Sequence, residues 1–359
     1  MNSLIAKDYE ILSSKKFREN VSKILSNHIN NPKFSIPNSF PILKRYSRLD
    51  SYTVNDIIKK ELTISRIGEF NDMFDGVVNT YFSRADFENK VKKDWHLIES
   101  IYKMTGIPIS DNEFSDYLSL HERNIDSKPN MILLDHIGTF VGCFTTDDRS
   151  KLMWSHYADK NTGICISYDL NKLKEEQILK KLIFPVVYSD QPIVFPDELE
   201  KSIDNYLHIK IICSALCKSI DWKYENEWRM IILMPLFNFE DIRLPVPINL
   251  YPEKICFGYH FLKKLFIHEK INQDSKALEE EKHRVSNYIT ILRELLSFMI
   301  EKNIKAEYVV PSIGNYNLTP ISIDLNKLNR LIESRFCQGR YYDIRFYHIT
   351  QNELLDLTK

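Results

Sequence analysis

TFVGCFT at residues 139–145 and ICISYDL at residues 164–170 are the two stretches that decide the fold. The first is an apolar run typical of a buried strand, and the second alternates between two faces as a strand does. Between them, residues 151–158 predict a short helix, because their apolar side chains recur at helical spacing. Strand, helix and strand in close succession place a sheet at the centre of the chain.

Further elements flank this centre without regular alternation. Strands are predicted at residues 42–46, 62–65, 184–189, 224–234, 254–261, 306–312, 319–325 and 341–349. Helices are predicted at residues 7–30, 51–60, 197–220 and 273–303, and near the C-terminus. A parallel sheet would require regular alternation of strand and helix, so an α+β fold with a mixed or antiparallel sheet is expected.

A single domain is expected to hold most of these elements. Residues 1–40 predict an N-terminal helical extension that ends in the proline-rich and asparagine-rich linker NNPKFSIPNSFP. Residues 41–325 form the predicted α+β catalytic domain, with a charged helical insertion at about 84–128. Residues 326–359 form a predicted C-terminal extension.

Glycine is scarce in this chain. Nine of the 359 residues are glycine, whereas average usage is roughly 7%. No pair of glycines has the spacing of a Walker loop, and no trio forms the dinucleotide motif G-x-G-x-x-G. These two phosphate-binding motifs are excluded, so a nucleotide would have to bind in another way.

The remaining composition is typical of a soluble globular protein. Apolar residues make up 43% of the chain, and 48 basic and 49 acidic residues give a net charge of −1. This balance argues against a dedicated nucleic-acid binder. The first ten residues carry charges where a signal peptide is apolar, and no run of 18 apolar residues exists. A cytoplasmic protein without a membrane span is expected.

The six cysteines are scattered, mostly in apolar surroundings, at positions 143, 165, 213, 217, 256 and 337. Cys213 and Cys217 are four residues apart, but no second pair or nearby histidine completes a zinc site. We expect buried free thiols, as in a reducing cytoplasm.

The segment LMWSHYAD at residues 152–159 concentrates side chains that carry chemistry. On the predicted helix, Trp154 and Tyr157 share an apolar face, and His156 lies elsewhere. The two rings are either core side chains or walls of a ligand site. His156 either hydrogen-bonds the backbone or acts as a titratable catalytic group.

A second concentration is WKYENEWR at residues 222–229. Because side chains alternate along a strand, a strand over residues 224–234 would place Glu225, Glu227 and Arg229 on one face. Arg229 would keep both carboxylates ionised, and one of them could then face a developing cation. The alternative is an exposed strand surface that carries salt bridges.

Two further segments supply polar groups. In KRY at residues 44–46, a cation at the strand end could clamp a phosphate or a carboxylate, although plain surface charge is the alternative. In FNDMFDG at residues 70–76, turn-forming Asn71, Asp72 and Asp75 could line a cleft. No histidine or glutamate at ligand spacing accompanies them, so no metal ion is expected.

These segments occur in a particular order along the chain. CFTTDDRSKLMWSHYADKNTGICISYD at 143–169 follows the loop at 70–76 and precedes VVYSD at 186–190, the segment W-x-Y-E-x-E-W-R, and ICFGYHF at 255–261. Over about residues 40–325 the chain thereby resembles a bacterial family known as domain of unknown function 2971. Met73 departs from the pattern, because that family usually has proline there.

A more distant similarity is to bacterial ADP-ribosyltransferase-like domains. They place a basic residue or histidine on a first strand, serine or threonine after a second, and Glu-x-Glu on a later one. The ordered counterparts here are Arg45, Thr145 and Glu225-x-Glu227. This resemblance implies a split-sheet core that binds NAD, as the substrate, without G-x-G-x-x-G.

The resemblance also implies roles for individual residues. NAD cleavage develops an oxocarbenium-like ribose cation, which the Glu227 carboxylate would stabilise. Arg45 would hold the pyrophosphate, and Tyr46 or Trp154 would stack on a ring.

The leading hypothesis is therefore an enzyme that cleaves NAD or transfers ADP-ribose to a protein or nucleic acid, as a toxin or phage-defence effector. Its expected catalytic residues are Glu227, Glu225 and His156. The expected binding residues are Arg45, Tyr46, Asn71, Asp72, Thr145, Trp154, Tyr157 and Arg229. The alternatives are a metal-dependent nuclease or hydrolase, and a non-catalytic module that binds a small ligand or a partner. The helix at 273–303 either mediates homo-oligomer formation or packs on its own sheet.

Overall fold

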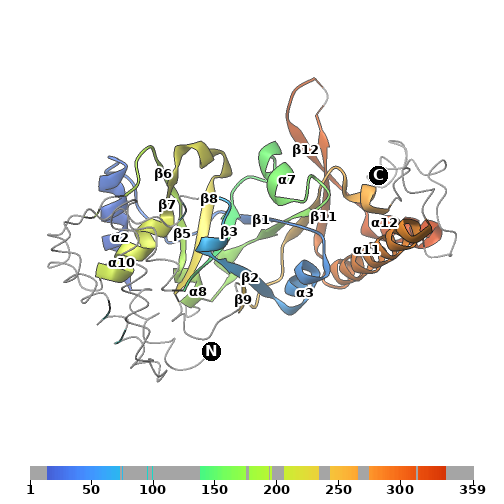
Figure 1. The fold of residues 1–359 in the computed structure, drawn as a ribbon, viewed down its shortest axis with the longest axis horizontal. Coiled ribbons are helices and arrows are strands. Elements are labelled where there is room, and N and C mark those ends of the chain that lie inside the picture. Colours follow the sequence, from blue (N-terminus) through green and yellow to red (C-terminus); the bar gives the residue numbers. More distant parts are fainter. Residues whose placement is uncertain are drawn as a thin grey trace. The chain divides into compact units, whose positions relative to one another are not determined.

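The computed structural model describes residues 14–72, 75, 95, 99, 138–174, 178–193, 195, 206–233, 243–265, 275–312 and 314–336. In these residues the protein is α+β, with a mixed, largely antiparallel sheet and several helices (Figure 1). This confirms the predicted class. The predicted insertion at 84–128, apart from Trp95 and Glu99, and the predicted strand at 341–349 lie outside the described residues.

The chain divides into two compact units, each assembled from distant segments. Unit 1 comprises residues 1–39, 63–143 and 173–246, and unit 2 comprises residues 40–62, 144–172 and 247–359. Strands β2 (Glu61–Arg66), β3 (Thr139–Thr145) and β9 (Arg243–Pro247) contribute residues to both. The domain boundaries predicted near residues 40 and 325 stay predictions.

Unit 2 is organised around one fully buried strand. The strand order is β12 (Leu318–Ser322), β11 (Lys305–Pro311), β10 (Lys254–Phe257), β4 (Ile164–Tyr168) and β1 (Leu43–Ser47). Neighbours are antiparallel except β10 and β11, which run parallel. All five residues of β4 are buried, and the strand is paired on both edges, with β10 and with β1.

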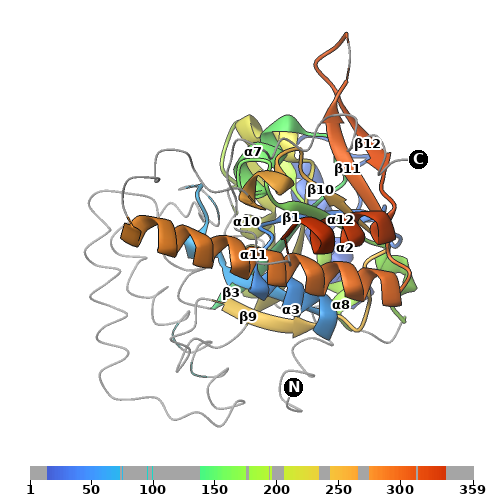
Figure 2. The same ribbon diagram turned by 90° about the vertical axis from the view of Figure 1, so that its right-hand side faces the viewer.

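The helices of unit 2 follow the predicted positions closely. They are α3 (Ser51–Lys59), α7 (Lys151–Tyr157), α11 (Ser275–Glu301) and α12 (Leu325–Phe336), with short 3-10 turns η2 (Leu170–Lys172) and η4 (Phe261–Leu265). Figure 2 shows α12 and α3 lying against α11. Most of the apolar stripe of α11 is buried within its own unit, including Val285, Leu292 and Met299, and homo-oligomer formation through this helix stays a prediction.

Gly163 lies at a backbone crossing in unit 2, between α7 and β4. A Cβ atom at this position would collide with the carbonyl oxygen of Ser47 and approach the Ala158 backbone to 3.0 Å. At Gly142, by contrast, the nearest atom is a methyl group of the Ile64 side chain. A backbone atom cannot move aside as a side chain can, so of these two glycines Gly163 is the one fixed by sterics.

Gly163→Ala is therefore expected to lower the free energy of unfolding by about 1–3 kcal/mol, the usual cost of overpacking. Gly142→Ala serves as the matched control and should cost less. Urea unfolding of the two variants measures the difference. Equal stability of both variants and the parent would contradict the proposed clash.

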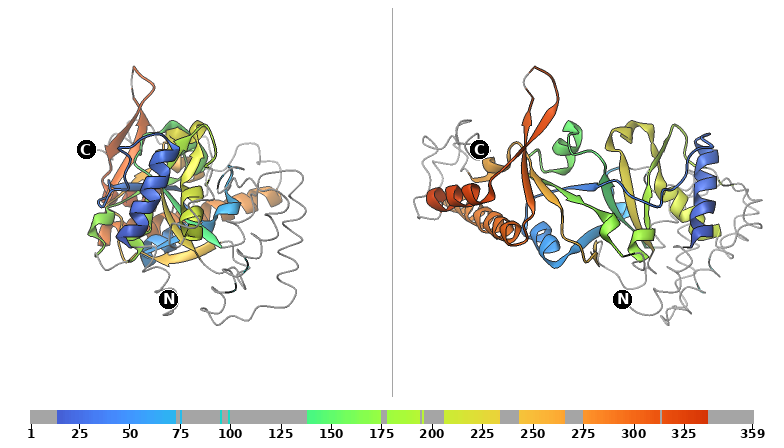
Figure 3. Two further views of the ribbon diagram at one scale, coloured as in Figure 1. Left: turned by 90° about the vertical axis from the view of Figure 1, so that its left-hand side faces the viewer. Right: turned by 180° about the vertical axis from the view of Figure 1, so that it is seen from behind.

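Unit 1 contains a second group of paired strands. Strand β8 (Glu227–Leu233) pairs with β3 and with β5 (Ile183–Pro185), and β2 pairs antiparallel with β3. Strands β6 (Val187–Ser189) and β7 (Cys217–Ser219) form a separate parallel pair. The remaining elements are α2 (Lys15–His28), α8 (Ile178–Lys181), α10 (Tyr206–Leu216), β9 (Arg243–Pro247), η1 (Ile67–Glu69) and η3 (Ile220–Glu225). Helix α2 packs against α10 (Figure 3).

Three boundaries in unit 1 differ from the prediction. The predicted strand at 184–189 is two strands, β5 and β6, separated at Val186. The helix predicted at 197–220 ends at Leu216, where β7 begins. The strand predicted at 224–234 begins at Glu227, because residues 220–225 form η3. Among the helices described, none is long and apolar enough to cross a membrane.

Candidate active site

The two glutamates of the Glu-x-Glu segment come from different local structures. Glu225 ends η3 and Glu227 begins β8, so alternation along one strand does not bring them together. Asn226 between them has a left-handed backbone (φ 45°, ψ 50°), a conformation that asparagine tolerates better than most residues. This turn directs both carboxylates toward one cation.

Lys218 on β7 is that cation. Its Nζ donates to Glu225 Oε2 at 2.7 Å and to Glu227 Oε2 at 3.2 Å. Asp75 Oδ2 lies 3.7 Å from the same ammonium. Three carboxylates therefore surround one lysine.

Arg229 completes the group from the next inward position of β8. Its Nε and Nη2 donate to Glu227 Oε1 and Oε2 at 2.9 and 3.0 Å, which is a bidentate fork. Its Nη1 lies 2.7 Å from Asp75 Oδ1 and donates to the Ala215 carbonyl at 2.7 Å. We call Asp75, Lys218, Glu225, Glu227 and Arg229 the charge cluster.

The charge cluster is removed from water. Arg229 is 0% exposed, Glu225 2%, Glu227 5% and Lys218 6%. The prediction that Arg229 would lie beside ionised carboxylates describes this geometry, but the exposed salt-bridged surface considered as its alternative does not. Because these side chains are shielded from water, each charge depends on its partners.

Neighbouring charges decide which protonation states the cluster holds. Burial alone would raise the pKa of Glu227, but the charges of Arg229 and Lys218 outweigh it and lower that pKa to about 2. Burial opposes the charge of Lys218, yet the carboxylates, Glu227 foremost, raise its pKa above the ordinary value. The Arg229 pKa is likewise held above its ordinary value by Glu227 and Asp75 against the effect of burial. Glu227 is therefore a carboxylate at any physiological pH.

This shift predicts a specific acid sensitivity. Because the folded-state pKa of Glu227 lies below its ordinary value of 4.5, its stabilisation is complete above pH 4.5. It is lost as the pH falls through about 2. The free energy of unfolding should therefore drop between these pH values by about 3 kcal/mol more in the parent than in Glu227→Gln. Urea unfolding at a series of pH values measures this, and parallel pH curves for the two proteins would contradict it.

Aromatic and sulfur groups surround the cluster. The Phe70 ring centre lies 5.5 Å from Arg229 Cζ, and the Trp222 ring centre lies 4.7 Å from Lys218 Nζ. The Tyr188 hydroxyl accepts a hydrogen bond from the Glu227 backbone N–H at 2.8 Å. The Cys143 thiol hydrogen-bonds to the Glu227 carboxylate. Burial, followed by the Glu227 charge, raises the pKa of this thiol. Of these contacts, those of Tyr188 and Cys143 hold Glu227 directly.

The predicted loop at 70–76 contributes only part of what was expected. Asp75 belongs to the charge cluster, whereas Asn71 is exposed. Asp72 is buried, and its carbonyl oxygen accepts a hydrogen bond from the Asp75 backbone N–H. Met73, Phe74 and Gly76 lie outside the described residues.

Tyr46 and Trp154 meet in unit 2. Their ring centres are 5.0 Å apart at 89°, and both are buried. The Tyr46 hydroxyl donates to the Asp147 carbonyl at 3.0 Å, and Trp154 Nε1 donates to the Asp148 carbonyl at 2.9 Å. This packing accounts for both rings without a ligand, and their predicted stacking role stays a prediction.

The other predicted residues of unit 2 are distributed around this pair. Thr145 is buried and its Oγ1 accepts from the Asp147 N–H at 3.1 Å. Arg45 lies half-buried on β1 opposite Ile166. His156 is exposed on α7, with its ring centre 6.2 Å from that of Tyr157.

The predicted residues thus form two groups, one in each unit. Glu225, Glu227 and Arg229 are brought together in unit 1 with Lys218 and Asp75. Lys218 was missed as a site residue because it lies in a three-residue strand that the sequence predicts as helix. In the part of the chain that the structure describes, no group of three or more His, Cys, Asp and Glu side chains is arranged to hold a metal ion.

Comparison with known proteins finds a family match for one segment. Residues 153–230 match a family described as "Protein of unknown function (DUF2971)", which confirms the resemblance over these residues. The matched segment begins beside Trp154 and ends just after Arg229. No curated protein and no solved structure matches the chain.

Proposed function

We propose that the charge cluster, four of whose five residues lie in the DUF2971 segment, is the catalytic centre of an enzyme that uses NAD. The enzyme either hydrolyses NAD or transfers its ADP-ribose to a protein or nucleic acid. The observation that carries the proposal is the buried Glu227 carboxylate, which Arg229 and Lys218 keep ionised. A toxin or phage-defence effector is the biological role proposed with this activity.

The reaction needs a fixed negative charge. When the bond between ribose C1′ and the nicotinamide nitrogen breaks, its electron pair leaves with nicotinamide and positive charge develops on the ribose. A preorganised carboxylate in a medium of low dielectric stabilises such a charge far better than it would in water. Glu227 supplies this negative charge, and the bidentate hydrogen bonds from Arg229 hold the Glu227 carboxylate in its orientation.

Glu225 is proposed as the group that handles the proton. Water or an acceptor group forms the new bond to C1′ and loses a proton, which the Glu225 carboxylate accepts. Its distance of 2.7 Å from Lys218 Nζ fixes its position. The two glutamates thereby take the separate roles that paired carboxylates have in glycosyl transfer.

Access to Glu227 requires one bond to open. Lys218 holds Glu225 at 2.7 Å but Glu227 at 3.2 Å, and the longer bond is the weaker. Release of Lys218 from Glu227 would leave the carboxylate held by Arg229 and free its Oε2 to face the substrate. Substrate binding is proposed to favour that arrangement.

The test is incubation of the purified full chain with NAD, with nicotinamide and ADP-ribose measured by chromatography. Nicotinamide with free ADP-ribose indicates hydrolysis, and nicotinamide with labelled protein or nucleic acid indicates transfer. Background levels of nicotinamide with every acceptor would reject the proposal. Cleavage of RNA or DNA that depends on a divalent metal ion would favour the hydrolase instead.

A further inference from the structure

Strands β11 and β12 form a hairpin that carries no charge over most of its length. Residues 308–323 contain no charged side chain, although charged residues make up 27% of the chain. Figures 1 and 2 show this hairpin extending beyond α7 within unit 2. The cores of protein interfaces are depleted in charged residues and enriched in aromatic ones. An uncharged and projecting hairpin therefore has the composition of a surface that another protein covers.

Tyr316 lies in the turn of this hairpin and faces solvent. Its side chain is 90% exposed, the highest value among the large apolar side chains that the structure describes. Lys151, the first residue of α7, lies beside it, with Nζ 5.7 Å from the centre of the Tyr316 ring. Within the described residues Lys151 forms no salt bridge. An aromatic ring and an unpaired cation are therefore presented together at one surface of unit 2.

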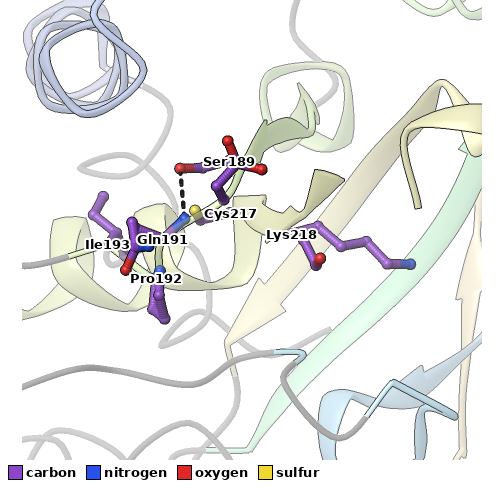
Figure 4. A pocket seen from close by; sticks show the side chains of 8 residues that line it. Ser189, Gln191, Pro192, Ile193, Cys217 and Lys218 are labelled. Atoms are coloured by element: carbon purple, nitrogen blue, oxygen red, sulfur yellow. Dashed lines mark hydrogen bonds between the residues drawn. The ribbon is translucent and has the colours of Figure 1, made fainter. Parts of the chain in front are cut away.

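A pocket in unit 1 lies at the ends of β6 and β7. Residues 189–193 and 217–219 line it, and its cavity volume is about 190 Å³. Since liquid water occupies about 30 Å³ per molecule, the cavity has room for roughly six such molecules, which is close to the size of one phenol ring. Figure 4 shows that the Lys218 side chain extends away from the other residues of the pocket. The cavity therefore suits the side chain of a tyrosine.

His28, the last residue of α2, holds the wall of this pocket in place. Its Nε2 lies 3.3 Å from Cys217 Sγ and 3.1 Å from the Gln191 carbonyl oxygen. The Gln191 backbone N–H in turn donates to Ser189 Oγ at 3.2 Å. These bonds form the pocket before any ligand is present. His28 and Cys217 are 189 positions apart, so the expectation that no histidine accompanies this cysteine is wrong in space.

The edge of the pocket is negatively charged. Asp190 lines the pocket and is exposed, and in the part of the chain that the structure describes it forms no salt bridge. Asp221 accepts a hydrogen bond from the hydroxyl of Ser219, another lining residue, at 3.2 Å. The ammonium of Lys218 is bound in the charge cluster instead. Two carboxylates at the pocket and one free ammonium at Lys151 make the two surfaces complementary in charge.

We propose that Tyr316 of one copy of this chain occupies the pocket of a second copy. The ring packs against Pro192 and Ile193, and Lys151 pairs with Asp190 at the edge. Tyrosine suits such a contact because its ring is apolar and its hydroxyl can still hydrogen-bond. A two-fold dimer formed in this way contains the contact twice, so that both pockets are filled. This inference does not depend on the proposed use of NAD.

The test is sedimentation velocity of the purified full chain over a concentration series. A dimer with a dissociation constant between about 1 and 100 µM is expected, the range of a small interface. Tyr316→Ala should raise that constant at least about tenfold, because an aromatic anchor in a pocket carries much of the binding energy. Tyr52→Ala is the matched control, since Tyr52 is also an exposed tyrosine of unit 2, at 74%, and should leave the constant unchanged.

A charge exchange tests the partner surface directly. Lys151→Glu and Asp190→Lys each place like charges opposite one another and should raise the dissociation constant about tenfold. The double variant restores opposite charges and should return the constant to within about threefold of the parent. All these positions are exposed, and circular dichroism checks the fold of each variant. A parent that stays monomeric up to about 500 µM, equal effects of Tyr316→Ala and Tyr52→Ala, or a double variant as weak as the single ones would each overturn the proposal.

Discussion

Arg229→Met is expected to lower the free energy of unfolding by about 3–5 kcal/mol, the usual cost of removing one partner from a buried ion pair. Methionine is close in length to arginine, so little volume is lost. Glu227 and Asp75, however, lose their guanidinium partner, and Arg229 is 0% exposed, so water cannot replace it. Urea unfolding followed by circular dichroism measures the change.

A matched control for this variant exists in unit 2. Arg293 Nη2 lies 3.0 Å from Glu333 Oε1, with both side chains more than 40% exposed. Arg293→Met makes the same chemical change and should cost no more than about 1 kcal/mol, because water solvates the remaining carboxylate. A similar small loss in both variants would show that burial of the cluster does not determine its energy.

Glu227→Gln is expected to reduce the rate of nicotinamide release from NAD by about 10²–10³-fold. Glutamine preserves shape and still accepts from Arg229, but it has no charge to offer the ribose cation. We expect the loss in kcat, with KM changed less than about threefold, because the charge matters most when the cation develops.

Two controls test whether a loss of activity in Glu227→Gln comes from the missing charge at that position rather than from unfolding. Glu333→Gln, at the exposed pair with Arg293, should retain full activity. Circular dichroism at the assay temperature must show that Glu227→Gln is folded, since removal of its charge also weakens the cluster. A folded Glu227→Gln protein that retains the parent rate would remove Glu227 from the mechanism.

Elements with strong local patterns could be predicted from sequence alone. Strand β3 occupies residues 139–145 as predicted, because an apolar run of that length with aromatic and β-branched residues favours a buried strand. Helix α11 begins and ends within two residues of the prediction, since its stripe repeats over many turns. Local signals of this strength are independent of the rest of the fold.

The charge cluster could be predicted only in part from local sequence patterns. Glu225, Glu227 and Arg229 were identified correctly as neighbours, but alternation along a strand is not the reason for Glu225. The left-handed turn at Asn226 brings the Glu225 carboxylate back to Lys218. Lys218 itself lies in a strand of three residues, too short for any periodicity to emerge.

Contacts between distant segments were beyond prediction for a different reason. His28 reaches Cys217 because α2 packs on α10, a contact set by tertiary structure. Asp75 reaches Arg229 in the same way, from a loop more than 150 positions earlier. Contacts between such distant residues leave no periodic pattern in a single sequence.

The division of the chain has a consequence for its synthesis on the ribosome. The chain passes between the units after residues 39, 62, 143, 172 and 246. The last segment of unit 1 emerges before β10, β11 and β12 do, so the edge of β4 that pairs with β10 must stay unpaired until β10 emerges. Unit 1 is therefore expected to gain protease resistance on stalled nascent chains before unit 2 does, and no single cut in the gene would yield either unit whole.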